Sequence, residues 1–161
     1  MVSRTANPSA TTSPATTRPL RRAFRGEPGQ VPLARDFVRR YLADAACPAE
    51  AAQDILVCTS ELATNAVLHS RSGHPGGYFT VEIAICRQDL QSRQDGHNGR
   101  GGQWVHVAVE DAGGPWAERG TGDSCTECGR GLHIVSELSA DMGITGGMSG
   151  RTAWFRSPAI I

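Results

Sequence analysis

Apolar residues recur at helical spacing in three segments of the chain. Between residues 31 and 45, one apolar stripe contains Ala34, Phe37, Val38, Tyr41, Leu42 and Ala45. A longer stripe runs from Pro48, a residue suited to a first helical turn, to His69, and contains Ala51, Ile55, Cys58, Leu62, Ala66 and Val67. The spacing predicts two amphipathic helices, and a shorter pattern predicts a third helix over 132–138.

Alternating apolar positions predict the strands. One face of 78–86 carries Phe79, Val81, Ile83 and Ile85, and one face of 104–111 carries Val105, Val107 and Val109. Further strands are predicted over 20–25, 142–145 and 151–156. The order is strand, two helices, two strands, an irregular stretch, helix and two strands. It predicts an α+β fold, a two-layer sandwich with the helices packed on one face of a mixed, mostly antiparallel sheet.

A chain of 161 residues has room for one domain of ordinary size. Residues 1–19 are rich in Ser, Thr and Pro, which predicts a disordered leader, although an acid-free, Arg- and Ser-rich start is also compatible with an organelle transit peptide. We predict that the domain covers 20–156 and that 157–161 form a short tail. The hydrophilic run RQDLQSRQDGHNGRGGQ over 87–103 is interpreted as a lengthened hairpin connection.

Charge and cysteine content narrow the choice of partner and compartment. The 16 basic and 16 acidic residues balance, which argues against DNA, another polyanion or a membrane surface as the main partner. No run approaches the roughly 20 apolar residues of a membrane helix. The number of cysteines is odd, which argues against a secreted disulfide scaffold; they are Cys47, Cys58, Cys86, Cys125 and Cys128. We therefore expect a cytoplasmic protein that binds neither nucleic acid nor membrane directly.

Two polar residues accompany the second apolar stripe, in the stretch SELATNAVLHS. Glu61 and Asn65 are four positions apart, so both project from one side of the predicted helix, either as a solvated edge or as part of a site. In VAVEDAGGP, a strand ends in Asp111 and is followed by Gly113 and Gly114. A carboxylate there can accept a hydrogen bond from an amino group while the glycines admit a flat ligand, but many tight turns share the pattern.

Glycines precede the third predicted helix in GRGLHIVSEL. Gly129 and Gly131 leave backbone N–H groups for an anion, which the helix dipole also attracts, so phosphate is the expected ligand. The pattern is neither a dinucleotide fingerprint nor a P-loop, because the third glycine and the Gly-Lys-Ser/Thr are absent. Just before it, Cys125 and Cys128 lack a second pair or a histidine at ligand spacing. We interpret them as incidental thiols, with a redox switch as the alternative.

The order and spacing of these motifs resemble the ATP-binding domain of the GHKL superfamily, which includes gyrase, chaperone, histidine kinase and mismatch-repair ATPases. The match covers about 20–155 and ends with GRTAWF on the last strand. Together with the short chain, ELATNAVLHS and GRGLHIVSELSADMG look like the stand-alone anti-sigma-factor serine/threonine kinases and their actinobacterial relatives. The resemblance implies a Bergerat-type ATP-binding fold.

The resemblance also implies a role for each motif residue. Glu61 corresponds to the general base, and Asn65 to the Mg²⁺ ligand that also binds the phosphates. Asp111 corresponds to the carboxylate that reads the adenine amino group, Gly113 gives the ring room, and Thr152 corresponds to a hydroxyl that reaches adenine through water. The phosphate lid contains Gly129, Arg130, Gly131 and Leu132.

By resemblance, we expect an ATP- and Mg²⁺-dependent protein serine/threonine kinase that acts as an anti-sigma-factor regulator. It would bind a sigma factor and phosphorylate a small anti-anti-sigma-type protein, and a homodimer is a family expectation. The alternative is a nucleotide-sensing, protein-binding module of the same fold that transfers no phosphate. One departure from the family is Pro115, which stands where the second glycine of the Asp-x-Gly-x-Gly motif usually lies.

Overall fold

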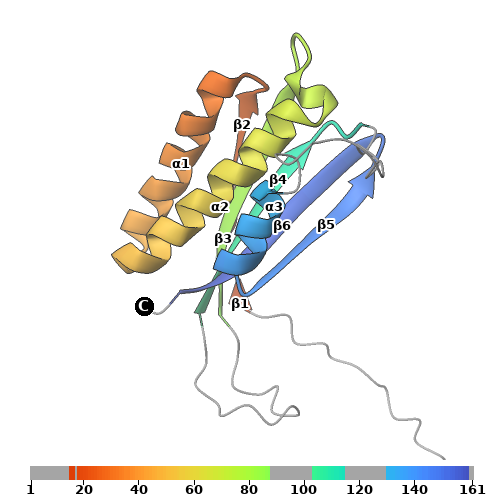
Figure 1. Cartoon of the computed structure of the whole chain (residues 1–161). Helices are drawn as coiled ribbons and strands as arrows, with labels where there is room; N and C mark the ends of the chain where they lie inside the picture. The colour runs from red at the N-terminus through yellow and green to blue at the C-terminus, as the bar shows by residue number, and fades with distance from the viewer. Residues whose placement is uncertain (1–14, 17, 88–102, 115–129, 160–161) are drawn as a thin grey trace, which may run out of the picture.

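A computed structural model of the chain describes residues 15–16, 18–87, 103–114 and 130–159. In this part of the chain, three α-helices lie on one face of a six-stranded sheet (Figure 1). The predicted α+β sandwich is confirmed. The predictions for most of the leader and of the linker, and those for Pro115, Cys125, Cys128 and Gly129, lie outside the described residues.

The helices follow the predicted apolar stripes. Helix α1 (Val31–Asp44) buries Ala34, Val38 and Leu42, and α2 (Ala49–Leu68) buries Ile55, Cys58, Thr59, Leu62, Ala63, Ala66 and Val67. Helix α3 (Arg130–Leu138) begins two residues before its predicted start. Short 3-10 turns, η1 (Pro28–Gln30) and η2 (Arg71–Gly73), precede α1 and follow α2. Within the described residues, none of the helices is long and apolar enough to cross a membrane.

The sheet is made of β1 (Ala15–Thr16), β2 (Leu20–Arg25), β3 (Tyr78–Arg87), β4 (Gln103–Asp111), β5 (Asp141–Gly147) and β6 (Gly150–Ala159). The strand order is β1-β3-β4-β6-β5, and β2 also pairs with β3. Every pairing among the described strands is antiparallel, so the expected mixed sheet is an antiparallel one.

Strand β1 lies wholly outside the predicted limits of the domain, and strand β6 lies partly outside them. Strand β1 falls within the segment predicted as a disordered leader and pairs with the end of β3. Strand β6 continues to Ala159 although Pro158 has no N–H to donate. Strand β5 pairs with β6 only as far as Arg156, whose carbonyl accepts from Ala140. Pro158 lies two residues further along β6, so its backbone faces the side of the strand on which β5 lies, but beyond the end of β5. No carbonyl of β5 is opposite it, and the absent N–H of Pro158 leaves no acceptor of that strand without a donor.

One hydrophobic core lies between the helices and the sheet. Its largest fully buried side chains include Phe79, Phe155, Leu42, Ile55, Leu62, Ile83 and Val135. None of the described helices covers the opposite face of the sheet (Figure 1). On that face the rings of His106 and Trp154 lie 5.8 Å apart. Burial, and to a smaller extent Arg156, lowers the pKa of His106.

Candidate functional site

Glu61 and Asn65 lie on the part of α2 that contacts the start of α3. A Cβ atom built on Gly131 would lie 2.7 Å from Oε2 of Glu61 and 3.6 Å from Oδ1 of Asn65. Only glycine therefore leaves the space between the two helices open. Neither polar side chain hydrogen bonds to another residue in the described part of the chain. A carboxylate and a carboxamide are thus available to a ligand beside Gly131.

Helix α3 begins at this space. Arg130 is exposed, Gly131 is buried, and Leu132 is half-buried against the core. The first N–H groups of a helix have no partner within it, and its dipole favours an anion at this end. Gly131, one described residue of the predicted phosphate lid, therefore lies next to Glu61 and Asn65.

Asp111 ends β4 and is 8% exposed. Its Oδ1 accepts the N–H of Gly113 at 2.7 Å, and its Oδ2 accepts Nε–H of Arg151 at 3.1 Å. The Nη2 atom of Arg151 also lies 3.1 Å from Oδ2 and donates to the carbonyl of His69 at 3.0 Å. A buried ion pair therefore links the ends of β4, β6 and α2.

The backbone that follows β4 is held by the segment after α2. The buried hydroxyl of Ser72 accepts the N–H of Ala112 at 2.9 Å and donates to the carbonyl of Tyr78 at 2.6 Å. The N–H of Arg71 donates to the carbonyl of Gly113 at 2.8 Å. Gly113 has a φ of 68°, and a Cβ there would overlap the backbone of the β5–β6 turn. No other residue type fits at this position without moving the backbone.

The structure does not bring Thr152 into this cluster. In the register of β4 and β6, Arg151 is paired with Asp111, whereas Thr152 is paired with the residue before it. Successive residues of a strand point to opposite faces, so Arg151 and not Thr152 lies beside the carboxylate. The sequence interpretation missed Arg151. The sequence did contain a signal for Arg151. Every second residue of a strand points to the same face, so Arg151, four positions before the buried Phe155, was expected to face inward as well.

Cys58 lies one turn before Glu61 in α2. Burial, followed by the charge of Asp54, raises the pKa of this thiol to about 11, so Cys58 is protonated and unreactive at neutral pH. No group of three or more His, Cys, Asp or Glu in the described residues could hold a metal ion. A cation at this site would therefore share its coordination between the Asn65 oxygen and ligand oxygens, which is how Mg²⁺ is commonly bound beside phosphates.

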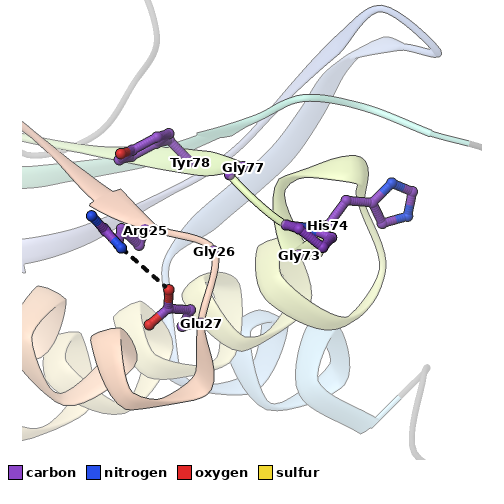
Figure 2. Close-up of a pocket in the computed structure, with 9 residues that line it drawn as sticks. Arg25, Gly26, Glu27, Gly73, His74, Gly77 and Tyr78 are labelled. Atoms are coloured by element: carbon purple, nitrogen blue, oxygen red, sulfur yellow. Dashed lines mark ion pairs between the residues drawn. The ribbon is translucent and has the colours of Figure 1, made fainter.

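A separate pocket of about 270 Å³ lies between the end of β2 and the loop after η2 (Figure 2). Its lining is Arg25, Gly26, Glu27, Gly73, His74, Pro75, Gly76, Gly77 and Tyr78. Nη1 of Arg25 and Oε1 of Glu27 are 3.9 Å apart, and Figure 2 shows the His74 ring directed away from this ion pair. No predicted site residue lines this pocket, which is therefore distinct from the Asp111 cluster.

The residues present fit a Mg²⁺-bound nucleoside triphosphate. At one end, the space that a Cβ of Gly131 would fill faces a carboxylate and a carboxamide that make no hydrogen bond to a described residue. At the other end, Asp111 offers an acceptor to a base amino group beside a loop that only glycine can form. Oxygen donors suit Mg²⁺, and the start of a helix suits phosphate.

Comparison with known proteins gives a family and a fold. The model of the histidine kinase-like ATPase domain family matches residues 24–156. No curated protein matches the chain. Among solved structures, the crystal structure of the RsbU and RsbW domains of Rv1364c from Mycobacterium tuberculosis is similar, with a TM-score of 0.60 and 22% identity over 88% of this chain. The chain spans 32% of the length of that longer chain, and at this identity the likeness shows a shared fold.

Proposed function

Because the chain belongs to the histidine kinase-like ATPase domain family, we propose that it binds ATP with Mg²⁺ and transfers the γ-phosphoryl group to a serine or threonine of a partner protein. The main support is the space beside Gly131, where the side chains of Glu61 and Asn65 have no hydrogen-bond partner among the described residues. Phosphoryl transfer depends on positioning and charge neutralisation more than on covalent chemistry, and this site can supply both.

At the phosphate end, Glu61 acts as the general base. Its carboxylate accepts the proton of the attacking hydroxyl as the oxygen bonds to the γ-phosphorus and the bond to the β–γ bridging oxygen breaks, leaving ADP. The carboxamide oxygen of Asn65 would hold Mg²⁺, which would supply neutralisation of the phosphate charge. Arg130, Gly131 and Leu132 contribute to the lid over the phosphates.

At the base end, Asp111 accepts a hydrogen bond from the 6-amino group of adenine. Gly113 lets the backbone after β4 approach the β5–β6 turn, which fixes the position of the chain beside Asp111. We assign no base contact to Thr152, because the strand register places it away from Asp111.

We further propose that the protein substrate is a small anti-anti-sigma-type protein and that a sigma factor is the second partner. Support comes from the motif sequences ELATNAVLHS and GRGLHIVSELSADMG, and from a shared fold with a structure that contains an RsbW domain. A cytoplasmic location and a homodimer complete the proposal.

The test combines nucleotide binding with phosphoryl transfer in the Glu61→Gln variant. Mg-ATP at a hundredfold excess over its Kd stabilises the folded state by about 2.7 kcal/mol, which raises Tm by roughly 5–10 °C for a chain of this size. Glu61→Gln keeps this shift but loses transfer of labelled phosphate from ATP to purified anti-anti-sigma-type proteins of the source organism. Glu50→Gln, an exposed substitution in the first turn of the same helix, changes neither result.

Three outcomes separate the candidates. Loss of transfer in Glu61→Gln with binding intact supports the kinase. Binding without transfer to any of these proteins, even in the wild type, assigns the chain to nucleotide-sensing, protein-binding modules. If millimolar Mg-ATP does not shift Tm, both the kinase and the nucleotide-sensing, protein-binding module are ruled out.

A further inference from the structure

A series of hydrogen bonds joins the two ends of the proposed site through Arg151. The carbonyl of Asn65 accepts the N–H of His69, the residue that caps the end of α2, at 2.9 Å. The carbonyl of His69 in turn accepts Nη2–H of Arg151 at 3.0 Å. Nε–H of the same guanidinium donates to Oδ2 of Asp111 at 3.1 Å. Arg151 therefore connects the helix that carries the phosphate-end residues to the carboxylate proposed for the base.

The guanidinium is suited to holding this carboxylate in one orientation. It is planar, and its N–H groups point in fixed directions. Here Nε–H and Nη2–H have different acceptors, one on Asp111 and one on α2, so the plane cannot turn without breaking one of the two hydrogen bonds. The side chains of Arg151 and Asp111 are 7% and 5% exposed, so water does not readily replace these bonds. The N–H of Gly113 holds the other carboxylate oxygen, Oδ1, at 2.7 Å.

The orientation of Asp111 matters because a hydrogen bond weakens steeply as its angle departs from linear. In the proposed function, the phosphates lie beside Glu61, Asn65 and Gly131, so the place of the adenine ring is set from the other end of the nucleotide. The 6-amino group then meets Asp111 at a fixed position. A carboxylate whose plane is already set relative to α2 loses no rotational freedom when the base binds.

We propose that Arg151 is a positioning residue for the recognition of adenine. It fixes the Asp111 carboxylate relative to α2, so that one nucleotide reaches Asn65 and Asp111 at the same time. In this role Arg151 acts through Asp111 and makes no contact with the nucleotide. This inference rests on the proposed ATP binding.

The test compares the Kd values of ATP, ADP and purine riboside triphosphate, each with Mg²⁺, by calorimetry. Purine riboside triphosphate differs from ATP only in lacking the 6-amino group, so its Kd divided by that of ATP, the amino-group ratio, measures recognition of this group. In the wild type we expect a ratio of about tenfold or more, as for a hydrogen bond to a charged acceptor. In Arg151→Lys we expect about threefold or less, because the ammonium is a point charge without two fixed donor directions.

The Kd of ADP divided by that of ATP reports the phosphate end and should keep its wild-type value in Arg151→Lys. A general loosening of the site would instead raise all three Kd values by the same factor and leave both ratios unchanged. A purely structural role of Arg151 therefore does not produce the expected result.

A second variant and a matched control complete the design. Arg151→Gln keeps a planar donor at the position of Nε but loses the donor to the His69 carbonyl, so it should lower the amino-group ratio as well. Arg156→Lys and Arg156→Gln make the same changes at an exposed arginine of the same strand, whose guanidinium lies over the Trp154 ring on the uncovered face of the sheet. They should change neither ratio.

Two results would overturn the inference. A wild-type amino-group ratio below about threefold, which no variant is needed to measure, would show that Asp111 offers the 6-amino group no oriented acceptor. A ratio of about tenfold or more in folded Arg151→Lys and Arg151→Gln would show that Asp111 is positioned without Arg151. In both cases ATP still binds and the proposed phosphoryl transfer can stand. A folded wild type that binds neither ATP nor ADP overturns the proposed function as well.

Discussion

Replacing Gly131 with alanine separates what the fold needs from what a ligand needs. Glycine in a helix costs up to about 1 kcal/mol relative to alanine. Gly131 is not among the glycines with positive φ, so alanine introduces no backbone strain. The nearest neighbour of the new methyl is Oε2 of Glu61 at 2.7 Å, the mobile end of a long side chain that can rotate away. Without nucleotide, we expect the free energy of unfolding to rise by up to about 1 kcal/mol and Tm by roughly 2–4 °C.

The same methyl group occupies the space proposed for the phosphates. It would lie 3.6 Å from Oδ1 and 3.7 Å from Nδ2 of Asn65 and would force Glu61 out of position. We therefore expect the Kd of Mg-ATP to rise by roughly tenfold or more, equivalent to about 1.4 kcal/mol. Scanning fluorimetry without nucleotide gives Tm, and calorimetry gives Kd. Gly29→Ala is the matched control, because a Cβ there meets nothing within 4 Å.

The Tm without nucleotide and the Kd of Mg-ATP can each contradict the expected role of Gly131. A variant with raised Tm and unchanged Kd would show that the space beside Gly131 is not used by ATP. A Tm lowered by several degrees would show that Glu61 cannot move, and that the glycine serves the packing of α3 on α2.

Three other predictions concern the surroundings of the site. Ser72→Ala removes two partly buried hydrogen bonds and is expected to lower the free energy of unfolding, measured by urea titration, by roughly 2–4 kcal/mol. The control Ser136→Ala, at an exposed serine, should change it little. If the two variants are equally stable, Ser72 does not have this role. Since burial lowers the pKa of His106 below its ordinary 6.5, the unfolded chain binds its proton more readily. The contribution of His106 to the free energy of unfolding is present above pH 6.5 and is lost as pH falls through the lowered pKa of the folded state. His106→Gln should make the free energy of unfolding depend less on pH in this range, and an unchanged dependence would assign it to other groups. Cys58 should resist thiol reagents in the native state at mildly alkaline pH and react after denaturation, as mass spectrometry of labelled protein would show; rapid native labelling would contradict its raised pKa.

The fold could be predicted because its long elements carry unbroken apolar patterns. The stripes of α1 and α2 and the alternation of β3 and β4 gave limits within one or two residues of those observed. Strand β1 could not be predicted, since two residues show no period and their partner strand lies far away in the sequence. The predicted end of β6 at residue 156 was wrong. The strand can continue through Pro158 because β5 stops pairing before that residue, and this depends on the whole sheet and not on the local sequence.

Part of the candidate site could also be predicted from the sequence, and part could not. Glu61, Asn65 and Gly131 belong to local motifs, and the structure brings these three together. The partner of Asp111 could not be read from GRTAWF alone, because two adjacent polar residues are equally plausible until the register of β6 decides which faces inward. The sequence interpretation gave Thr152 a water-mediated contact with adenine and named no partner for Asp111, whereas the register places Arg151 beside the carboxylate.

The two ends of the site are tied to the fold to different degrees. Asp111 is held by Arg151 and Gly113, so removing its charge breaks a buried ion pair, which costs about 3–5 kcal/mol out of a total stability of roughly 5–15 kcal/mol. Substitution of Asp111 therefore changes folding and binding together, and a lost Tm shift in such a variant does not report on adenine alone. Glu61 and Asn65 have no hydrogen bonds to other described residues, so we expect their substitution to change the proposed chemistry more than the stability. The phosphate end is accordingly where catalysis can be tested separately from stability, whereas recognition of the base is best tested by changing the nucleotide.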